Sequence, residues 1–79
     1  MSDPKQLIEL LARGLVDRPE EVEVTEQRQI SGARFMVRAN PDDIGRLVGR
    51  EGRTVRAIRT LLNAAADLDG ARYTLDISD

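Results

Sequence analysis

Four residues, Gly49-Arg50-Glu51-Gly52, interrupt two stretches of sequence whose apolar residues recur with helical spacing. The short stretch DDIGRLV precedes them, and the longer RTVRAIRTLLNAAADL follows with the clearest amphipathic pattern in the chain. A helix that ends at Val48 and begins again at Arg53 must turn within four residues, and glycine at both edges permits backbone angles that a side chain would forbid. The sequence therefore predicts a short helix and a long helix joined by a tight glycine turn.

The rest of the chain contains one further helical pattern and three patterns of alternating polarity. Asp3 and Pro4 provide an N-cap and a first helical residue for an amphipathic helix that ends near Gly14. Alternating stretches occur in EEVEVTEQRQI and ARFMVRA, which Ser31-Gly32 should join as a hairpin turn, and again in RYTLDIS. The predicted order is helix, strand, strand, short helix, long helix, strand. This order favours an α+β fold in which three helices pack on one face of a three-stranded sheet, and we expect one domain over residues 1–79.

Short sequence patterns also predict the positions and roles of individual side chains. The dipeptide Asn40-Pro41 is a helix start signal, because it combines a capping residue with proline at the first helical position. Asp42 and Asp43 then fall in the first turn, where we expect them to cap the helix and to interact with its dipole. In the second strand, the residues expected on the buried face are Phe35, Val37 and Ala39.

Composition argues against an enzyme or a metalloprotein. The 79 residues include neither cysteine nor histidine, which removes the commonest zinc ligands, the commonest general base and the thiolate nucleophile together. We therefore expect no enzyme activity, no metal and no cofactor. The absence of cysteine fits a reducing compartment, no apolar run reaches the ~20 residues of a membrane helix, and the N-terminus lacks the pattern of a secretory signal. These features predict a cytoplasmic protein with no membrane partner.

Positive charge is concentrated around the glycine turn. Residues 46–59 contain five arginines and one glutamate, a local charge of +4, whereas the whole chain has a net charge of −2. Glycines without a Cβ allow a ligand backbone to come close, and the free amides at the start of the long helix lie at the positive end of its dipole. Arg50 and Arg53 flank the turn, and Arg46 lies one helical turn before Arg50. The pattern predicts a site for a polyanion, since a basic patch on an acidic body determines where a polyanion binds.

Two simpler interpretations remain open on these residues alone. Glycines between helices are often mere turn residues, and arginines at every third helical position, such as Arg53, Arg56 and Arg59, often form a solvated face. Residues 41–68 also have the arrangement of a helix-turn-helix that binds duplex DNA, although the strands before and after the segment argue against it.

The stretch IGRLVGREGRTVRAIR resembles the signature of the KH domain, in which a GxxG loop between two helices clamps four nucleotides of a single strand. The order of elements resembles the type II, bacterial form of that domain. The chain is also similar in length and layout to the small single-domain bacterial KH proteins of the KhpA type, in LVDRPEEVEV, in ANPDDIGRLVGREGRTVRAIRTLLNAAA and in the closing alternating strand. On this resemblance, the residues expected to bind RNA are Ile44, Gly45, Arg46, Val48, Gly49, Arg50, Glu51, Gly52, Arg53 and Arg56.

The resemblance implies a function as well as a fold. It implies a single-stranded RNA-binding protein that acts as an RNA chaperone, pairs with a larger KH protein carrying a second nucleic-acid-binding domain, and is linked to cell elongation and envelope growth. A homodimer is an open alternative, because the alanines of NAAAD in the long helix permit close packing against a second subunit. A protein-interaction module for which RNA contact is secondary is another.

The predicted RNA site has two unusual details. Phe35 and Tyr73 are the only aromatic residues, so we expect both rings in the core and no aromatic stacking platform. Glu51 places a carboxylate where phosphates would pass, so that either it faces away or it accepts a hydrogen bond from a base or a 2′-hydroxyl, and Arg50 should supply more of the electrostatic attraction. The aliphatic side chains that could line a groove for the bases are Val37, Ile44, Leu47 and Val48, although most of these must also serve the core.

Overall fold

The computed structural model describes residues 3–79. The helices are α1 (Pro4–Leu15), α2 (Ile44–Val48) and α3 (Arg53–Asp69), and the strands are β1 (Glu23–Gln29), β2 (Gly32–Arg38) and β3 (Arg72–Ser78). Short 3₁₀ turns span Pro19–Glu21, Pro41–Asp43 and Arg50–Gly52. The predicted order of helices and strands is confirmed.

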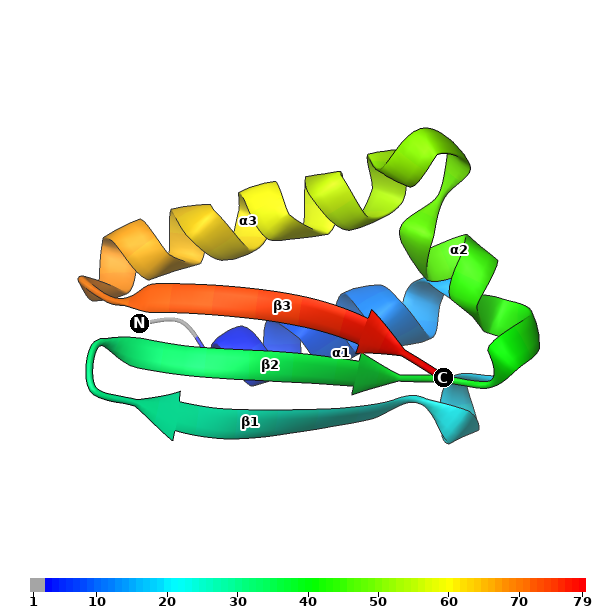
Figure 1. The fold of residues 1–79 in the computed structure, drawn as a ribbon, viewed down its shortest axis with the longest axis horizontal. Helices are drawn as coiled ribbons and strands as arrows, with labels where there is room; N and C mark the ends of the chain where they lie inside the picture. Colours follow the sequence, from blue (N-terminus) through cyan, green and yellow to red (C-terminus); the bar gives the residue numbers. More distant parts are fainter. Residues whose placement is uncertain (1–2) are drawn as a thin grey trace.

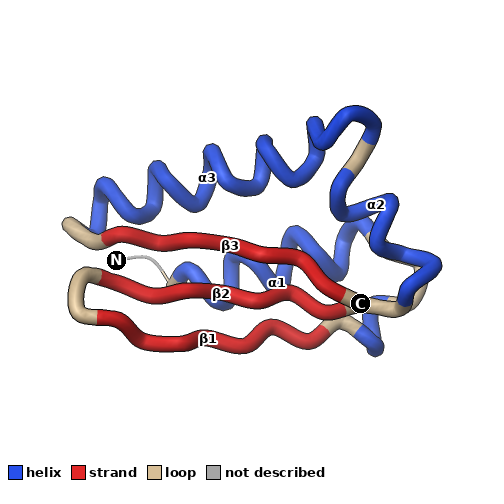
Figure 2. The backbone as a smooth tube through the Cα atoms, viewed as in Figure 1, coloured by secondary structure: helices blue, strands red, loops and turns tan. Residues whose placement is uncertain are grey.

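The three strands form one mixed sheet in the order β1-β2-β3. The central strand β2 pairs with β1 in antiparallel register and with β3 in parallel register. Figures 1 and 2 show α1 and α3 running along the sheet, with α2 at the end where β2 and β3 finish. The parallel pairing requires a crossover between β2 and β3, and α2 and α3 provide it.

One face of the sheet is buried beneath the helices. Along β2, residues 33, 35 and 37 are buried, whereas Arg34 and Arg38 on the opposite face are exposed, which confirms the predicted alternation. Phe35 is completely buried, at 0% exposure. The largest apolar side chains that the helices add to this core are Ile8, Leu47 and Leu62.

The hairpin between β1 and β2 turns one residue earlier than the sequence predicts. Gln29 pairs with Gly32, so the two turn residues are Ile30 and Ser31, and Gly32 is already the first residue of β2. Glycine is required there because a Cβ would collide with the backbone of Arg72 on β3. The glycine therefore serves a close approach between strands, and the expectation of a Ser31-Gly32 turn is wrong.

Phe35 lies in the core and Tyr73 packs against it, as the sequence predicts. Tyr73 meets Phe35 edge to face, with ring centroids 5.8 Å apart. The Tyr73 hydroxyl donates a 2.6 Å hydrogen bond to Oδ2 of Asp69 at the end of α3. The rings therefore fasten the start of β3 to β2 and α3, and they do not form an open platform for bases.

The contact with Asp69 predicts a pH dependence. The hydrogen bond to the Asp69 carboxylate and, next, burial raise the pKa of Tyr73 above its ordinary value of 10.0. Because the folded pKa is the higher one, this contribution to stability is complete below the unfolded pKa and is lost as the pH rises through the folded pKa. We expect Asp69→Asn to lower the pKa of this single tyrosine in an ultraviolet absorbance titration. A titration that Asp69→Asn leaves unchanged would contradict the assignment.

Candidate nucleic-acid interface

The turn between α2 and α3 contains three residues with positive φ within four positions. Gly49 has φ 77° and ψ 169°, Glu51 has φ 57°, and Gly52 has φ 75°. The Gly49 amide closes α2 with a 2.8 Å hydrogen bond to the Gly45 carbonyl, and the Gly52 amide bonds the Gly49 carbonyl at 3.1 Å. The expectation that Gly49 stops one helix and Gly52 precedes the next is confirmed.

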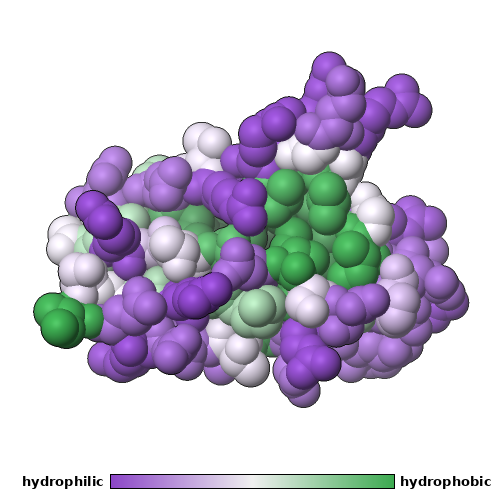
Figure 3. All heavy atoms as spheres, viewed as in Figure 1, coloured by the Kyte–Doolittle hydropathy of each residue, from purple (hydrophilic) through white to green (hydrophobic). Residues whose placement is uncertain are grey.

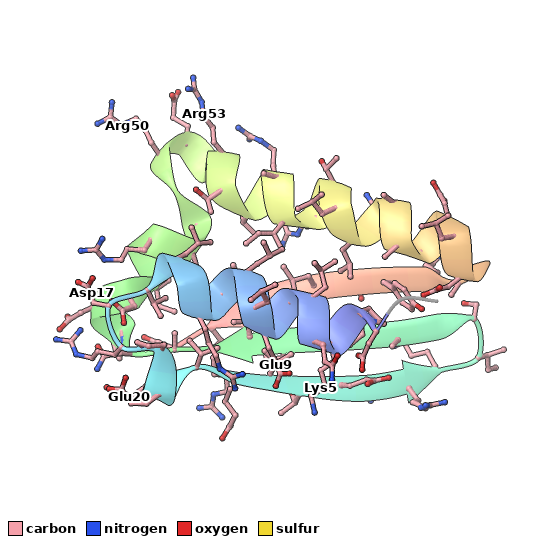
Figure 4. All side chains as sticks on the ribbon, turned by 180° about the vertical axis from the view of Figure 1, so that it is seen from behind. Lys5, Glu9, Asp17, Glu20, Arg50 and Arg53 are labelled. Carbon is pink, nitrogen blue, oxygen red and sulfur yellow. The ribbon has the colours of Figure 1, made fainter. Side chains whose placement is uncertain are left out.

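The side chains of the turn project into solvent. Figure 4 shows Arg50 and Arg53 extending from the turn, away from the sheet and the other helices. Glu51 is exposed, and its carboxylate lies 3.8 Å from the guanidinium of Arg53. Glu51 therefore points into solvent and partly balances a neighbouring arginine, and its relation to a bound RNA strand stays a prediction. Arg50 and Arg56 have no acidic partner among residues 3–79, so they are the uncompensated cations of this region.

Arg46 differs from the other arginines of the basic patch. Its guanidinium lies 2.9 Å from the Asp17 carboxylate, in the segment after α1, and 3.8 Å from the Asp43 carboxylate. Figure 4 shows Asp17 at the end of α1, away from the turn that carries Arg50. The structure thus gives Arg46 a role in linking α2 to the chain after α1, which the sequence did not reveal.

Asp43 is a buried tertiary contact and does not cap α2 with its side chain. Its exposure is 1%, and its carboxylate accepts hydrogen bonds from the backbone amides of Asp17 at 3.3 Å and Arg18 at 3.1 Å. The Arg18 guanidinium lies 3.8 Å away. The predicted cap is provided by Asn40, whose side chain accepts from the Asp42 amide at 2.9 Å. The capping role expected for Asp43 is therefore wrong, because the carboxylate instead satisfies two amides of a distant segment.

The apolar surface beside the turn is narrower than predicted. Ile44 and Val48 of α2 are half-buried and pack against the core together with Ile77 of β3. Figure 3 shows this region as an apolar patch beneath the projecting turn, bordered by polar side chains. Leu47 and Val37 are 1% and 2% exposed, so they support the patch from inside and cannot carry bases.

Arg59 is exposed, as the sequence predicts, but its guanidinium is already engaged in hydrogen bonds. Its Nη2 and Nε donate hydrogen bonds to the Leu75 carbonyl at 2.9 and 3.3 Å. Because β3 is an edge strand, this carbonyl faces away from β2, and Arg59 covers it from α3. The contact ties the middle of α3 to the edge of the sheet.

Within residues 3–79 the structure has no group of metal-ligating side chains and no helix long and apolar enough to cross a membrane.

A mixed three-stranded sheet, α1 and α3 along it, α2 at its end and a glycine turn between α2 and α3 together define a KH domain. Residues 5–77 match the family model described as "KhpA/KhpB, KH domain". The chain belongs to this KhpA/KhpB KH-domain family, since the match covers nearly its whole length. The helix-turn-helix interpretation of residues 41–68 gains no support, because they form the central part of this domain.

Curated relatives agree with this assignment. The chain is 44% identical to a protein of Leifsonia xyli over 87% of the chain and 88% of the relative, and 43% identical to one of Treponema pallidum over 95% and 94%. It is 36% identical to a protein of Clostridium perfringens over 92% and 97%. Each is named "RNA-binding protein KhpA", and the family is not an enzyme family. No solved structure gives a significant match.

Proposed function

We propose that the chain binds single-stranded RNA at the turn between α2 and α3 and the apolar patch beside it. The observation that carries the proposal is the turn itself, in which Arg50 projects without an acidic partner and Gly52 leaves the backbone uncovered, since a Cβ there would meet only Nη1 of Arg56, at 3.7 Å. Arginine and backbone amides suit phosphate oxygens, and Ile44 and Val48 offer an aliphatic surface to bases. The naming of the relatives as RNA-binding proteins supports the same function.

Residues of the turn have different roles in this proposal. Gly52 allows close approach of the RNA backbone, whereas the missing Cβ of Gly49 makes room for Thr54 at the start of α3. Arg50, Arg53 and Arg56 attract phosphates. Arg46 contributes mainly by holding α2 in place, since Asp17 and Asp43 already balance its charge. Glu51 weakens the positive field at the turn, which favours modest affinity and little sequence preference.

Exchanging both central residues of the turn for aspartate tests the proposal. We expect Arg50→Asp/Glu51→Asp to abolish the electrophoretic shift of single-stranded RNA while the circular dichroism spectrum stays that of the folded protein. Arg28→Asp is the matched control, because it changes the net charge equally on an exposed residue of β1, far along the chain from the turn. An unchanged RNA shift for the double variant would show that the turn is not the binding site.

The proposal extends to a protein partner. The family description joins KhpA with KhpB, and α3 exposes Leu61 and Leu68, which lie seven residues apart and so on one side of the helix. This apolar surface is suited to contact either the larger KH partner that the resemblance implies or a second copy of the chain. A pull-down with the Arg50→Asp/Glu51→Asp variant separates the roles, because a partner retained without RNA contact identifies an interaction module.

The physiological part of the proposal comes from the family resemblance. It comprises RNA chaperone activity, a cytoplasmic location, and a link to cell elongation and envelope growth. A strand-annealing assay on structured RNA examines the chaperone activity directly, with the Arg50→Asp/Glu51→Asp variant as the inactive reference.

A further inference from the structure

A hollow of about 240 Å³ lies between α3 and β3, outside the set of residues assigned to the turn. Its lining residues are Arg59, Leu62, Asn63, Tyr73, Thr74 and Leu75. Leu62 and Leu75 are buried and give it an apolar floor. Typical pockets for drug-sized ligands measure about 300–1,000 Å³, so this hollow suits one flat heterocycle better than a larger molecule.

The rim of the hollow carries polar groups that can form hydrogen bonds with the edge of such a heterocycle. Arg59 uses two of its N–H groups on the Leu75 carbonyl, and a guanidinium has five, so three remain to donate. The Asn63 amide has no hydrogen-bond partner among residues 3–79, and it can both donate and accept. Amide and guanidinium groups are the side chains that most often pair with base edges.

The hollow continues from the proposed RNA site along one side of α3. Arg56, Arg59 and Asn63 are separated by three and four residues, so they lie on the same side of the helix. Arg56 begins this row next to the turn, because its Nη1 lies within 3.7 Å of the place where a Cβ on Gly52 would stand. Asn63 lies about 10 Å further along the helix axis. Figure 1 shows α3 running from the turn back along the sheet, with β3 beneath the helix.

We propose that this hollow binds one nucleobase of an RNA strand whose neighbouring nucleotides are held at the turn. The inference rests on the proposed function, since the strand must first be held by the turn. The base lies over Leu62 and Leu75, with its polar edge toward Asn63 and the free donors of Arg59. The row of arginines carries the connecting phosphates. The binding site is therefore longer than the four nucleotides that a GxxG loop clamps.

The length of the RNA tests this subsite. Fluorescence anisotropy measures the affinities of labelled oligouridylates of four and seven nucleotides for the wild type and two variants. Asn63→Trp fills the hollow. Gln6→Trp is its control, because it places the same side chain on an exposed residue of α1. Base contacts of this kind contribute about tenfold or more in affinity. In the wild type and in Gln6→Trp we expect the longer RNA to bind at least about tenfold more tightly. In Asn63→Trp the gain should fall to the roughly fourfold that follows from the greater number of binding registers.

Photochemical crosslinking locates the base independently of that variant. The wild type is irradiated with the seven-nucleotide RNA carrying 4-thiouridine at its first or last position, and then digested with trypsin. Crosslinks to the peptide of residues 60–72 support the subsite. Crosslinks confined to other peptides, together with an equal gain in Asn63→Trp and wild type, overturn the subsite but leave the turn in place. Failure of the wild type to bind either RNA overturns the proposed function, and the subsite with it.

Discussion

Asp43→Ala is expected to lower the free energy of unfolding by about 3 kcal/mol, because the substitution removes the only carboxylate buried in the described part of the chain. Two backbone amides, of Asp17 and Arg18, then lose their acceptor, and each unsatisfied buried donor costs about 1–3 kcal/mol. A domain of this length has a total stability of about 4–12 kcal/mol. The loss should appear as a fall in melting temperature of about 12–24 °C by differential scanning calorimetry.

The neighbouring residue provides the control. Asp42 is exposed and has one distant pair, 3.9 Å to Arg18, so Asp42→Ala should change stability by less than about 0.5 kcal/mol. Asp43→Asn should fall between the two, since the amide retains one oxygen acceptor. Equal melting temperatures for Asp43→Ala and Asp42→Ala would show that the carboxylate does not hold α2 to the segment after α1.

Gly49→Ala is expected to destabilise the fold by about 3 kcal/mol. Backbone angles of φ 77° and ψ 169° belong to a region that is essentially restricted to glycine, and forcing another residue into it costs about 1–3 kcal/mol. A Cβ at this position would also collide with the side chain and amide of Thr54 at the start of α3, and such overpacking costs about 1–3 kcal/mol. Urea unfolding followed by circular dichroism measures the change.

Gly45→Ala is the matched comparison for this prediction. Gly45 lies within α2 and a Cβ there meets no atom within 4 Å, so alanine should be neutral or stabilising by up to about 1 kcal/mol. The two substitutions add the same methyl group four residues apart, and they differ only in backbone conformation and available space. Similar unfolding midpoints for both variants would mean that the turn can adopt another conformation.

The architecture could be predicted from the sequence because the residues that face the core recur with the period of a helix or a strand. The spacing of Val55, Ile58 and Leu62 along α3 and the alternation around Phe35 record which face of each element meets the core. The turn could also be predicted, since glycine adopts the positive φ angles at positions 49 and 52 far more readily than other residues. The positive φ of Glu51 could not be predicted from its residue type. The glycines at positions 49 and 52 determine the path of the chain, and Glu51 follows it.

The contacts of single charged side chains could not be predicted. Asp43 has the local pattern of a helix cap, but its partners lie 25 and 26 residues earlier, and no local pattern encodes such a distance. The same is true of Arg59, whose partner Leu75 lies 16 residues later on the edge strand. In both cases a tertiary acceptor or donor outweighs the local preference, since a buried amide or carbonyl without a partner is costly.

The parallel pairing of β2 with β3 determines when, during synthesis and folding, the turn reaches the geometry that binds RNA. The turn lies within the connection between these strands, and β3 is made of residues 72–78, which leave the ribosome after every residue of the turn. Until β3 docks, the apolar underside of α3 has no Leu75 beneath it and Arg59 has no carbonyl to hold. The glycines and arginines of the turn are thus synthesised early but are oriented late, so a nascent chain would reach its RNA-binding geometry only at the end of folding.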